Sequence, residues 1–187
     1  MERGAGSEGR ERLFIGVPLT DDARVAIAAS LPGKLPGKPV PRENWHFTLR
    51  FLGATSAEAR DQIVERLRSA TCGDPFTIRF NEMGAFPNPK RARILWLGID
   101  EGAERLVQLA AIAEGAARSV GFEPESREFK PHLTLSRIDP PAAVATLLAS
   151  KARFGARMIV DAVILYRSLL GGGPARYEEV LRIELGR

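Results

Sequence analysis

The chain has 187 residues, of which 44% are hydrophobic and 27% are charged, values that are ordinary for a soluble globular protein. Its 27 basic residues outnumber its 23 acidic residues, and the net charge of +4 favours an anionic partner without naming one. The single cysteine, Cys72, excludes an internal disulfide framework, and no apolar run approaches the roughly 20 residues needed to cross a membrane. These features predict a cytoplasmic protein with no membrane association.

The first half of the chain predicts alternating strands and helices. Residues 1–11, rich in Gly, Glu and Arg, are expected to form a disordered tail and not a secretory signal. Periodicity and a capping Thr20 then predict strand, helix, strand, helix and strand over 12–19, 20–31, 45–53, 56–70 and 76–86. A loop with four prolines, residues 32–42, separates the first helix from the second strand.

The second half predicts the same order again. After a turn at residues 88–90, the pattern predicts a strand, a helix and a second strand over 94–99, 101–120 and 131–138. A helix opened by Pro140-Pro141, an extended stretch over 154–170 and a last strand over 177–185 follow. The run Gly171–Gly173 favours a hairpin turn over an anion-binding nest. The recurrence predicts duplicated β-α-β-α-β units that form two pseudo-symmetric lobes of one domain, residues 12–187.

The only two histidines of the chain occur in the same four-residue frame, His46–Leu49 and His132–Leu135. On a strand, residues i and i+2 share a face, so each histidine projects with its threonine, opposite the apolar residues. Two such strands facing one cleft would hold two imidazoles and two hydroxyls. Because the pKa of an imidazole is roughly 6.5, one ring could give a proton while the other takes one.

This constellation suits phosphoryl chemistry on a strained cyclic phosphodiester. One group must deprotonate water, another must protonate the departing ribose oxygen, and donors must hold the remaining oxygens. The sequence contains no His-Glu-x-x-His, no His-x-His and no Gly-x-Ser-x-Gly, so metal hydrolysis and a serine triad are disfavoured. We expect no metal and no cofactor.

Further candidates follow from strand parity. Arg50 shares a face with the first motif, and Lys130 and Ser136 share one with the second, whereas Arg137 has the opposite parity at the end of its strand. For Arg50 and Lys130, phosphate contact and a solvated surface charge both stay open. Aromatic residues near the motifs could stack a base or belong to the core: Phe14, Trp45, Phe86, Phe129 and Tyr177.

The sequence resembles the RNA 2′,3′-cyclic phosphodiesterases, historically called 2′-5′ RNA ligases, of the two-histidine phosphoesterase superfamily. The similarity rests on segments that extend over nearly the whole chain: residues 12–19, 43–53, 86–87 followed by 93–98, 129–137 and 173–177. The resemblance implies an α+β fold with antiparallel sheets around a central cleft, and hydrolysis of an RNA-terminal 2′,3′-cyclic phosphate to a 2′-phosphate without metal.

The resemblance also implies residue roles. His46 would be the proton donor and His132 the proton acceptor, with Thr48 and Thr134 holding the phosphate. Further predicted substrate contacts are Arg50, Lys130, Ser136, Phe14 and Tyr177. Where the family usually has arginine before the second Pro-His, this chain has Lys130, which keeps the charge and loses bidentate geometry.

Two other functions remain open at this point. One is ligation of tRNA halves through a 2′-5′ bond, which is related chemistry in the reverse direction. The other is a non-catalytic module that binds RNA ends or nucleotides, although no residue of either motif has been lost. The expected partners are RNA ends or cyclic nucleotides, with no obligate protein partner and a monomeric protein.

Overall fold

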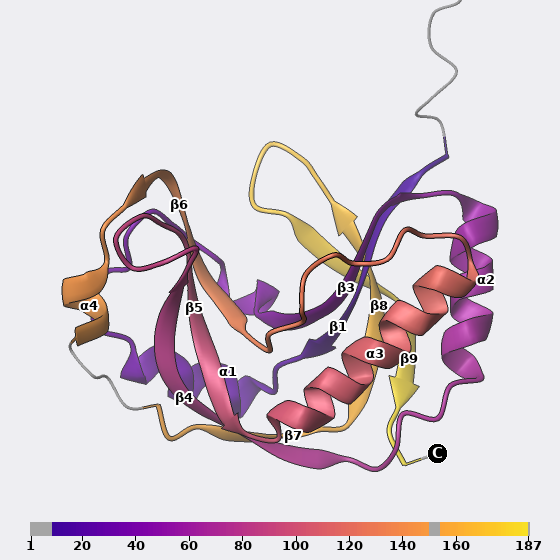
Figure 1. The fold of residues 1–187 in the computed structure, drawn as a ribbon, viewed down its shortest axis with the longest axis horizontal. Coiled ribbons are helices and arrows are strands. Elements are labelled where there is room, and N and C mark those ends of the chain that lie inside the picture. Colours follow the sequence, from indigo (N-terminus) through magenta and orange to yellow (C-terminus); the bar gives the residue numbers. More distant parts are fainter. Residues whose placement is uncertain (1–8, 150–153, 187) are drawn as a thin grey trace, which may run out of the picture.

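The computed structural model describes residues 9–149 and 154–186 (Figure 1). Most of the predicted tail, residues 1–8, lies outside the described residues, and the first strand begins at Glu11. The strands are β1 Glu11–Pro18, β2 Lys38–Pro39, β3 His46–Thr55, β4 Phe76–Phe86, β5 Ala92–Glu101, β6 Leu133–Ala142, β7 Arg157–Val160, β8 Ala162–Leu169 and β9 Arg176–Glu184. The helices are α1 Asp21–Ser30, η1 Arg42–Asn44 (a 3₁₀ turn), α2 Ala57–Arg68, α3 Ala103–Ser119 and α4 Ala145–Ala149.

The described strands form one nine-stranded antiparallel sheet. Its order is β7-β4-β5-β6-β3-β1-β8-β9, and β2 lies beside β6. The two motif strands, β3 and β6, are neighbours at the centre, joined through the single residue pair Phe47 and Leu133. Strands β7, β4, β5 and β6, with β2 beside β6, therefore lie on one side of this junction, and β3, β1, β8 and β9 lie on the other; Figure 1 shows them as two groups. This arrangement confirms the predicted α+β class with two lobes.

The two lobes are not the two consecutive halves of the sequence. Strand β4 pairs with β5 and β7, although it closes the first predicted unit. Strands β8 and β9 return from the end of the chain to pair beside β1. The short turn after β4 explains the first exchange, because a connection this short joins neighbouring antiparallel strands. Each half of the sequence thus contributes strands to both lobes.

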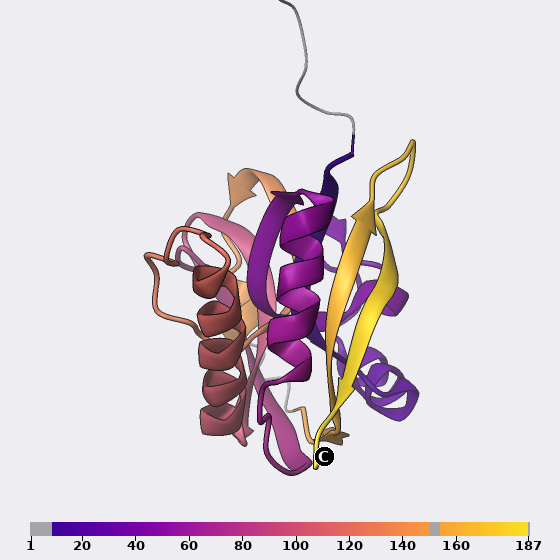
Figure 2. The same cartoon turned by 90° about the vertical axis from the view of Figure 1, so that its right-hand side faces the viewer.

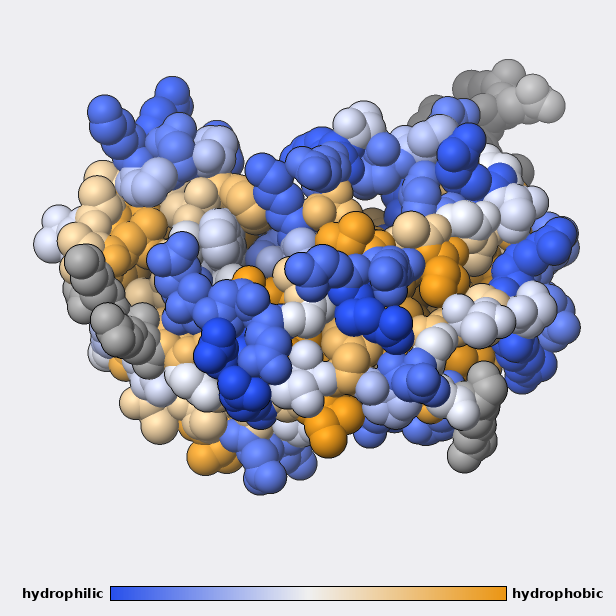
Figure 3. Space-filling view, turned by 60° about the horizontal axis from the view of Figure 1, so that its bottom comes forward, coloured by the Kyte–Doolittle hydropathy of each residue, from blue (hydrophilic) through white to orange (hydrophobic). Residues whose placement is uncertain are grey.

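Helices α2 and α3 lie side by side on the outside of the sheet (Figure 2). Both turn apolar residues inward, such as Ile63 of α2 and Leu106 of α3, which are fully buried. Hydroxyls cap two helices as their sequences indicate, since Thr20 accepts from Ala23 N–H and Ser56 accepts from Ala59 N–H. Figure 3 shows hydrophobic side chains interspersed among hydrophilic ones on the face at the bottom of Figure 1.

Three local predictions differ from the structure. Pro140-Pro141 lies within β6 and does not open a helix, which begins only at Ala145. Proline is tolerated near the end of a strand, where few ladder hydrogen bonds are lost. The proline-rich loop contains the short strand β2, and the extended stretch over 154–170 divides into β7 and β8. No helix among the described residues is long and apolar enough to cross a membrane.

Candidate active site

The junction between β3 and β6 brings the two motifs together. Phe47 and Leu133, which follow the two histidines, are paired across the junction and fully buried in the main core. Because side chains alternate along a strand, His46 and Thr134 project on the other face. A charge on His132 is the smallest of the causes that shift the pKa of His46, and it lowers that pKa.

The two histidines are oriented by the same contact. Nδ1 of His46 donates to the carbonyl oxygen of Asn44 at 2.7 Å, and Nδ1 of His132 donates to that of Lys130 at 2.6 Å. A carbonyl oxygen only accepts, so Nδ1 carries a hydrogen in both rings and Nε2 is the atom that can exchange a proton. In the neutral ring, Nε2 of His46 accepts from the hydroxyl of Thr48 at 2.9 Å.

Burial shifts the proton affinity of both rings. Desolvation lowers the pKa of His46 from 6.5 to about 4, with smaller lowering by the charges of Arg137 and His132 and an opposing effect of the Asn44 carbonyl. Desolvation also lowers the pKa of His132, opposed by the Lys130 carbonyl and assisted by Arg137. Both imidazoles are therefore mainly neutral at pH 7 in the protein alone.

Aromatic rings surround both imidazoles. Phe14 lies 4.7 Å from His46 between ring centroids, and Tyr177 meets the same imidazole edge-on at 5.2 Å. Phe86 meets His132 edge-on at 5.1 Å. Phe14 is only 2% exposed and packs against the imidazole of His46, and its contact with substrate stays a prediction. Tyr177 is half-buried and stays a candidate for stacking a base.

A β-bulge in β3 changes the predicted position of Arg50. Consecutive residues of β1 pair with Thr48 and Arg50, which leaves Leu49 as an extra residue and reverses the alternation beyond it. Arg50 consequently turns toward α3, so the prediction that it shares the histidine face is wrong, and nothing in the structure supports its predicted contact with phosphate. Phe51 takes its place on the histidine face, 53% exposed and 5.8 Å from Phe14.

A second bulge in β6 has the same effect at the equivalent position. Consecutive residues of β5 pair with Thr134 and Ser136, which leaves Leu135 extra. Ser136 is fully buried and its hydroxyl donates to the carbonyl oxygen of Pro36 at 2.5 Å, so the prediction that it shares the histidine face is wrong, and nothing in the structure supports its predicted contact with substrate. Arg137 is exposed in its place, and its charge lowers the pKa of both histidines.

Arg137 is thus a cation of the site that parity reasoning missed. The one sequence feature related to this position is the repeat of the motif. Both copies carry a bulge three residues after the histidine, so the two strands change parity at the same place. Lys130 is exposed, and its carbonyl orients His132, while the role of its side chain stays a prediction. Asn44 was also missed: its amide donates to the Ala175 carbonyl oxygen at 2.6 Å and ties the segment before β9 to the site.

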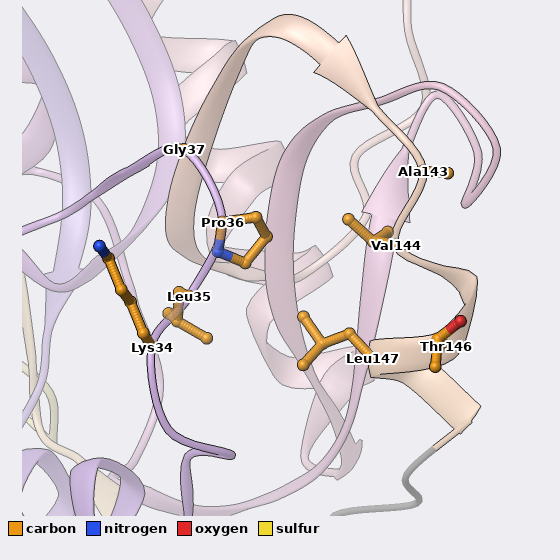
Figure 4. A pocket seen from close by; sticks show the side chains of 8 residues that line it. All are labelled: Lys34, Leu35, Pro36, Gly37, Ala143, Val144, Thr146 and Leu147. Carbon is orange, nitrogen blue, oxygen red and sulfur yellow. The ribbon is translucent and has the colours of Figure 1, made fainter.

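Two pockets lie near these strands. One, of about 600 Å³, adjoins His46 and is lined in part by Arg24, Tyr166, Tyr177 and Arg182. The other, of about 570 Å³, separates residues 34–37 from residues 143–147 and contains none of the predicted site residues (Figure 4). Among the described residues, no three His, Cys, Asp or Glu side chains gather as metal ligands would.

Comparisons with known proteins agree with this geometry. Residues 21–172 match the 2′-5′ RNA ligase superfamily. A relative from Archaeoglobus fulgidus, named RNA 2′,3′-cyclic phosphodiesterase, is 36% identical over 87% of this chain and 94% of its own length. A relative of that name from Aeropyrum pernix is 43% identical, but the alignment spans 56% of this chain and 58% of the relative.

The fold is also similar to a solved structure. The apo form of Escherichia coli LigT has a TM-score of 0.81 and 28% identity, and the match covers 96% of this chain and 100% of LigT. The extent of the family match and the paired motifs lead to one conclusion: this chain belongs to the 2′-5′ RNA ligase superfamily.

Proposed function

We propose that the protein hydrolyses an RNA-terminal 2′,3′-cyclic phosphate to a 2′-phosphomonoester by metal-independent general acid and base catalysis. The observation that supports this function is the shared geometry of the histidines, each with Nδ1 bonded to a carbonyl and Nε2 left to exchange a proton. The name RNA 2′,3′-cyclic phosphodiesterase, carried by relatives of this chain, agrees with it.

In the proposed reaction, His132 accepts a proton from water as the water oxygen bonds to phosphorus. The bond from phosphorus to the ribose 3′ oxygen breaks, and His46 donates a proton to that oxygen. Thr48 and Thr134 hold the phosphate oxygens, and Arg137 compensates their negative charge. Each ring then holds the opposite protonation state, and exchange with solvent restores the starting one.

The neutral state of His46 in the protein alone is compatible with its proposed role as the acid. Its low pKa arises mainly from burial, which penalises the imidazolium. A phosphate anion beside the ring favours the imidazolium again, because an opposite charge raises the pKa of a base. Binding of the substrate should therefore bring a proton onto His46.

The pocket beside His46 is the proposed site of the terminal nucleoside. The leaving 3′ oxygen belongs to the ribose, so the nucleoside lies on the side of the ring that protonates it. Tyr177 lines this pocket and offers an aromatic ring there, and Lys130 is the proposed phosphate contact beside the other motif. Both assignments follow from the proposed roles of the two histidines.

The test is hydrolysis of a 2′,3′-cyclic nucleotide or a cyclic-ended oligonucleotide in the presence of EDTA. Activity should survive the chelator, and His46→Ala and His132→Ala should each lower turnover about 10²- to 10⁴-fold. Arg79→Ala, which removes an exposed ion pair with Asp100, serves as the control and should keep full activity. Undiminished turnover in either histidine variant would refute the assignment.

We also propose that the protein acts as a cytoplasmic monomer. Both motifs lie in one chain and meet at one junction, so no second copy is needed to complete the site. Cys72 is buried and forms no disulfide, in keeping with a reducing compartment. Light scattering after size-exclusion chromatography gives the mass in solution, and a mass of twice 20.4 kDa or more would contradict the monomer.

A further inference from the structure

Arg50 connects three parts of the molecule through its guanidinium group. Nε lies 2.7 Å from a carboxylate oxygen of Glu114 in α3, an ion pair that is not aligned as a hydrogen bond. One terminal nitrogen donates to the carbonyl oxygen of Phe51 at 3.1 Å and lies 3.5 Å from the carboxylate of Glu125. The other terminal nitrogen donates to the carbonyl oxygen of Glu123 at 2.5 Å.

This cation is unusually buried for an ion-paired side chain. The side chain of Arg50 is 10% exposed, less than that of any other arginine in the ion pairs of residues 9–149 and 154–186. Removing a charge from water is costly unless partners replace the lost hydration. The bulge in β3 that turns Arg50 inward therefore requires the acidic and carbonyl partners that surround it.

Those partners belong to the segment that leads to the second histidine. Residues 123–132 join α3 to β6 and contain no helix or strand. Arg50 contacts this segment at Glu123 and Glu125, and Glu114 accepts from the backbone N–H of Glu125 at 3.2 Å. Near its end the segment contains Lys130, whose carbonyl oxygen accepts from Nδ1 of His132.

We propose that Arg50 is a positioning residue that fixes the segment orienting His132 and thereby holds the second motif in register with the first. Its effect on catalysis rests on the proposed function, whereas its effect on His132 does not. The four contacts are made in different directions by three nitrogens, which requires a planar guanidinium. A lysine at this position keeps the charge but carries one compact ammonium group, which cannot meet all of them.

The test compares Arg50→Lys with Arg79→Lys. Arg79 makes two hydrogen bonds to Asp100 at the edge between β4 and β5 and touches neither motif. We expect Arg50→Lys to lower kcat about 10- to 100-fold while KM changes less than about threefold, because small misplacement of a catalytic group reduces turnover more than binding. Arg79→Lys should leave both constants unchanged, and wild-type kcat in Arg50→Lys would overturn the proposal.

Proton NMR provides a second measurement that needs no substrate. The chain has two histidines, so His46→Ala and His132→Ala assign both ring signals. In Arg50→Lys, the pKa of His132 should rise toward 6.5, because burial is the largest cause of its lowering and a loosened segment admits water, while the charge of Arg137 remains. The pKa of His46 should stay near 4.

Equal movement of both pKa values, or movement of neither, would overturn the proposal. If Arg50→Lys does not fold, Glu125→Gln removes the charge of the half-exposed partner in the same ion pair. It should raise the pKa of His132 as Arg50→Lys does, but by less. A wild-type protein that hydrolyses no cyclic phosphate would refute the proposed function, and the titration of His132 would still decide the role of Arg50.

Discussion

At the residue scale, the site depends on how two imidazoles of equal chemistry are held in a poorly solvated place. Each ring is held through Nδ1 by a carbonyl two residues earlier, so its reactive nitrogen points where the strand turns it. Burial and the charge of Arg137 oppose protonation of both rings. The same cation that should attract phosphate thus keeps the imidazoles neutral until an anion arrives.

The pH dependence of hydrolysis should show that burial and Arg137 oppose protonation of the histidines, whereas bound phosphate favours it. Catalysis requires one charged and one neutral ring, so the profile should be bell-shaped. Because both pKa values lie below 6.5 in the free enzyme, raising the pH above about 6.5 removes the needed proton, and kcat/KM should fall there. The optimum of kcat should lie at higher pH, since bound phosphate raises the pKa.

Initial rates with a 2′,3′-cyclic nucleotide between pH 4 and 9 provide both profiles. The variant Arg79→Lys, with an exposed ion pair remote from the histidines, should reproduce them. A kcat/KM optimum well above pH 7 would contradict the lowered pKa values. So would a flat profile across the whole range.

At the element scale, two equivalent bulges decide which side chains face the cleft. Each strand alternates regularly from its histidine to its threonine, and the bulge then reverses the alternation. Arg50 and Ser136 turn away from the histidines, while Phe51 and Arg137 are exposed in their place. The two motifs therefore share both their sequence and an irregularity of the backbone.

This irregularity marks the limit of what the sequence predicts here. The motif residues, the capped helices and the order of the strands follow local patterns, and the structure agrees with them. A bulge depends on pairing with a neighbouring strand, so parity beyond Leu49 and Leu135 could not be predicted from one strand. The exchange of β4 and β8 between lobes likewise depends on long-range pairing.

The contact of Gly37 with β6 offers a test of how the second bulge positions Arg137. Gly37 has a φ of +76°, and a Cβ atom there would collide with the carbonyl oxygen of Arg137 and lie 2.9 Å from Cα of Ile138. Gly37→Ala should therefore displace β6 and lower kcat/KM by about tenfold, through lost contact between Arg137 and phosphate. Both kinetics and urea midpoints should be measured.

Gly33→Ala is the matched control in the same loop. Gly33 also has a positive φ, +63°, but a Cβ atom there would meet nothing within 4 Å. Both variants should lose about 1 to 2 kcal/mol of stability from the left-handed backbone. Only Gly37→Ala should lose activity, and equal activity of the two variants would contradict the contact.

At the scale of the whole molecule, the exchange of strands ties the lobes into one unit. Strand β4 follows β1 and β3 in the sequence but lies in the other lobe. Strands β8 and β9 come last in the sequence and lie in the lobe of β1 and β3. Neither lobe can complete its sheet from a continuous piece of chain. We therefore expect residues 12–187 to unfold as a single domain, with no intermediate in which one lobe persists.

The two tryptophans allow this expectation to be tested in each lobe. Trp45 precedes β3, and Trp96 lies in β5 on the other side of the junction. Trp45→Phe and Trp96→Phe each leave one tryptophan. In each variant, the urea midpoint measured by the fluorescence of that tryptophan should coincide with the midpoint measured by far-ultraviolet circular dichroism, as cooperative unfolding requires. The wild-type chain is the reference, and separated midpoints in either variant would show that the lobes unfold independently.

The single residue pair between β3 and β6 has a geometric consequence. The sheet forks at Phe47 and Leu133, and each branch of the fork carries one imidazole directly beside the branching point. A rotation of one branch against the other would therefore change the separation of the two rings. The distance between the two imidazoles thus depends on the angle between the two branches of the sheet.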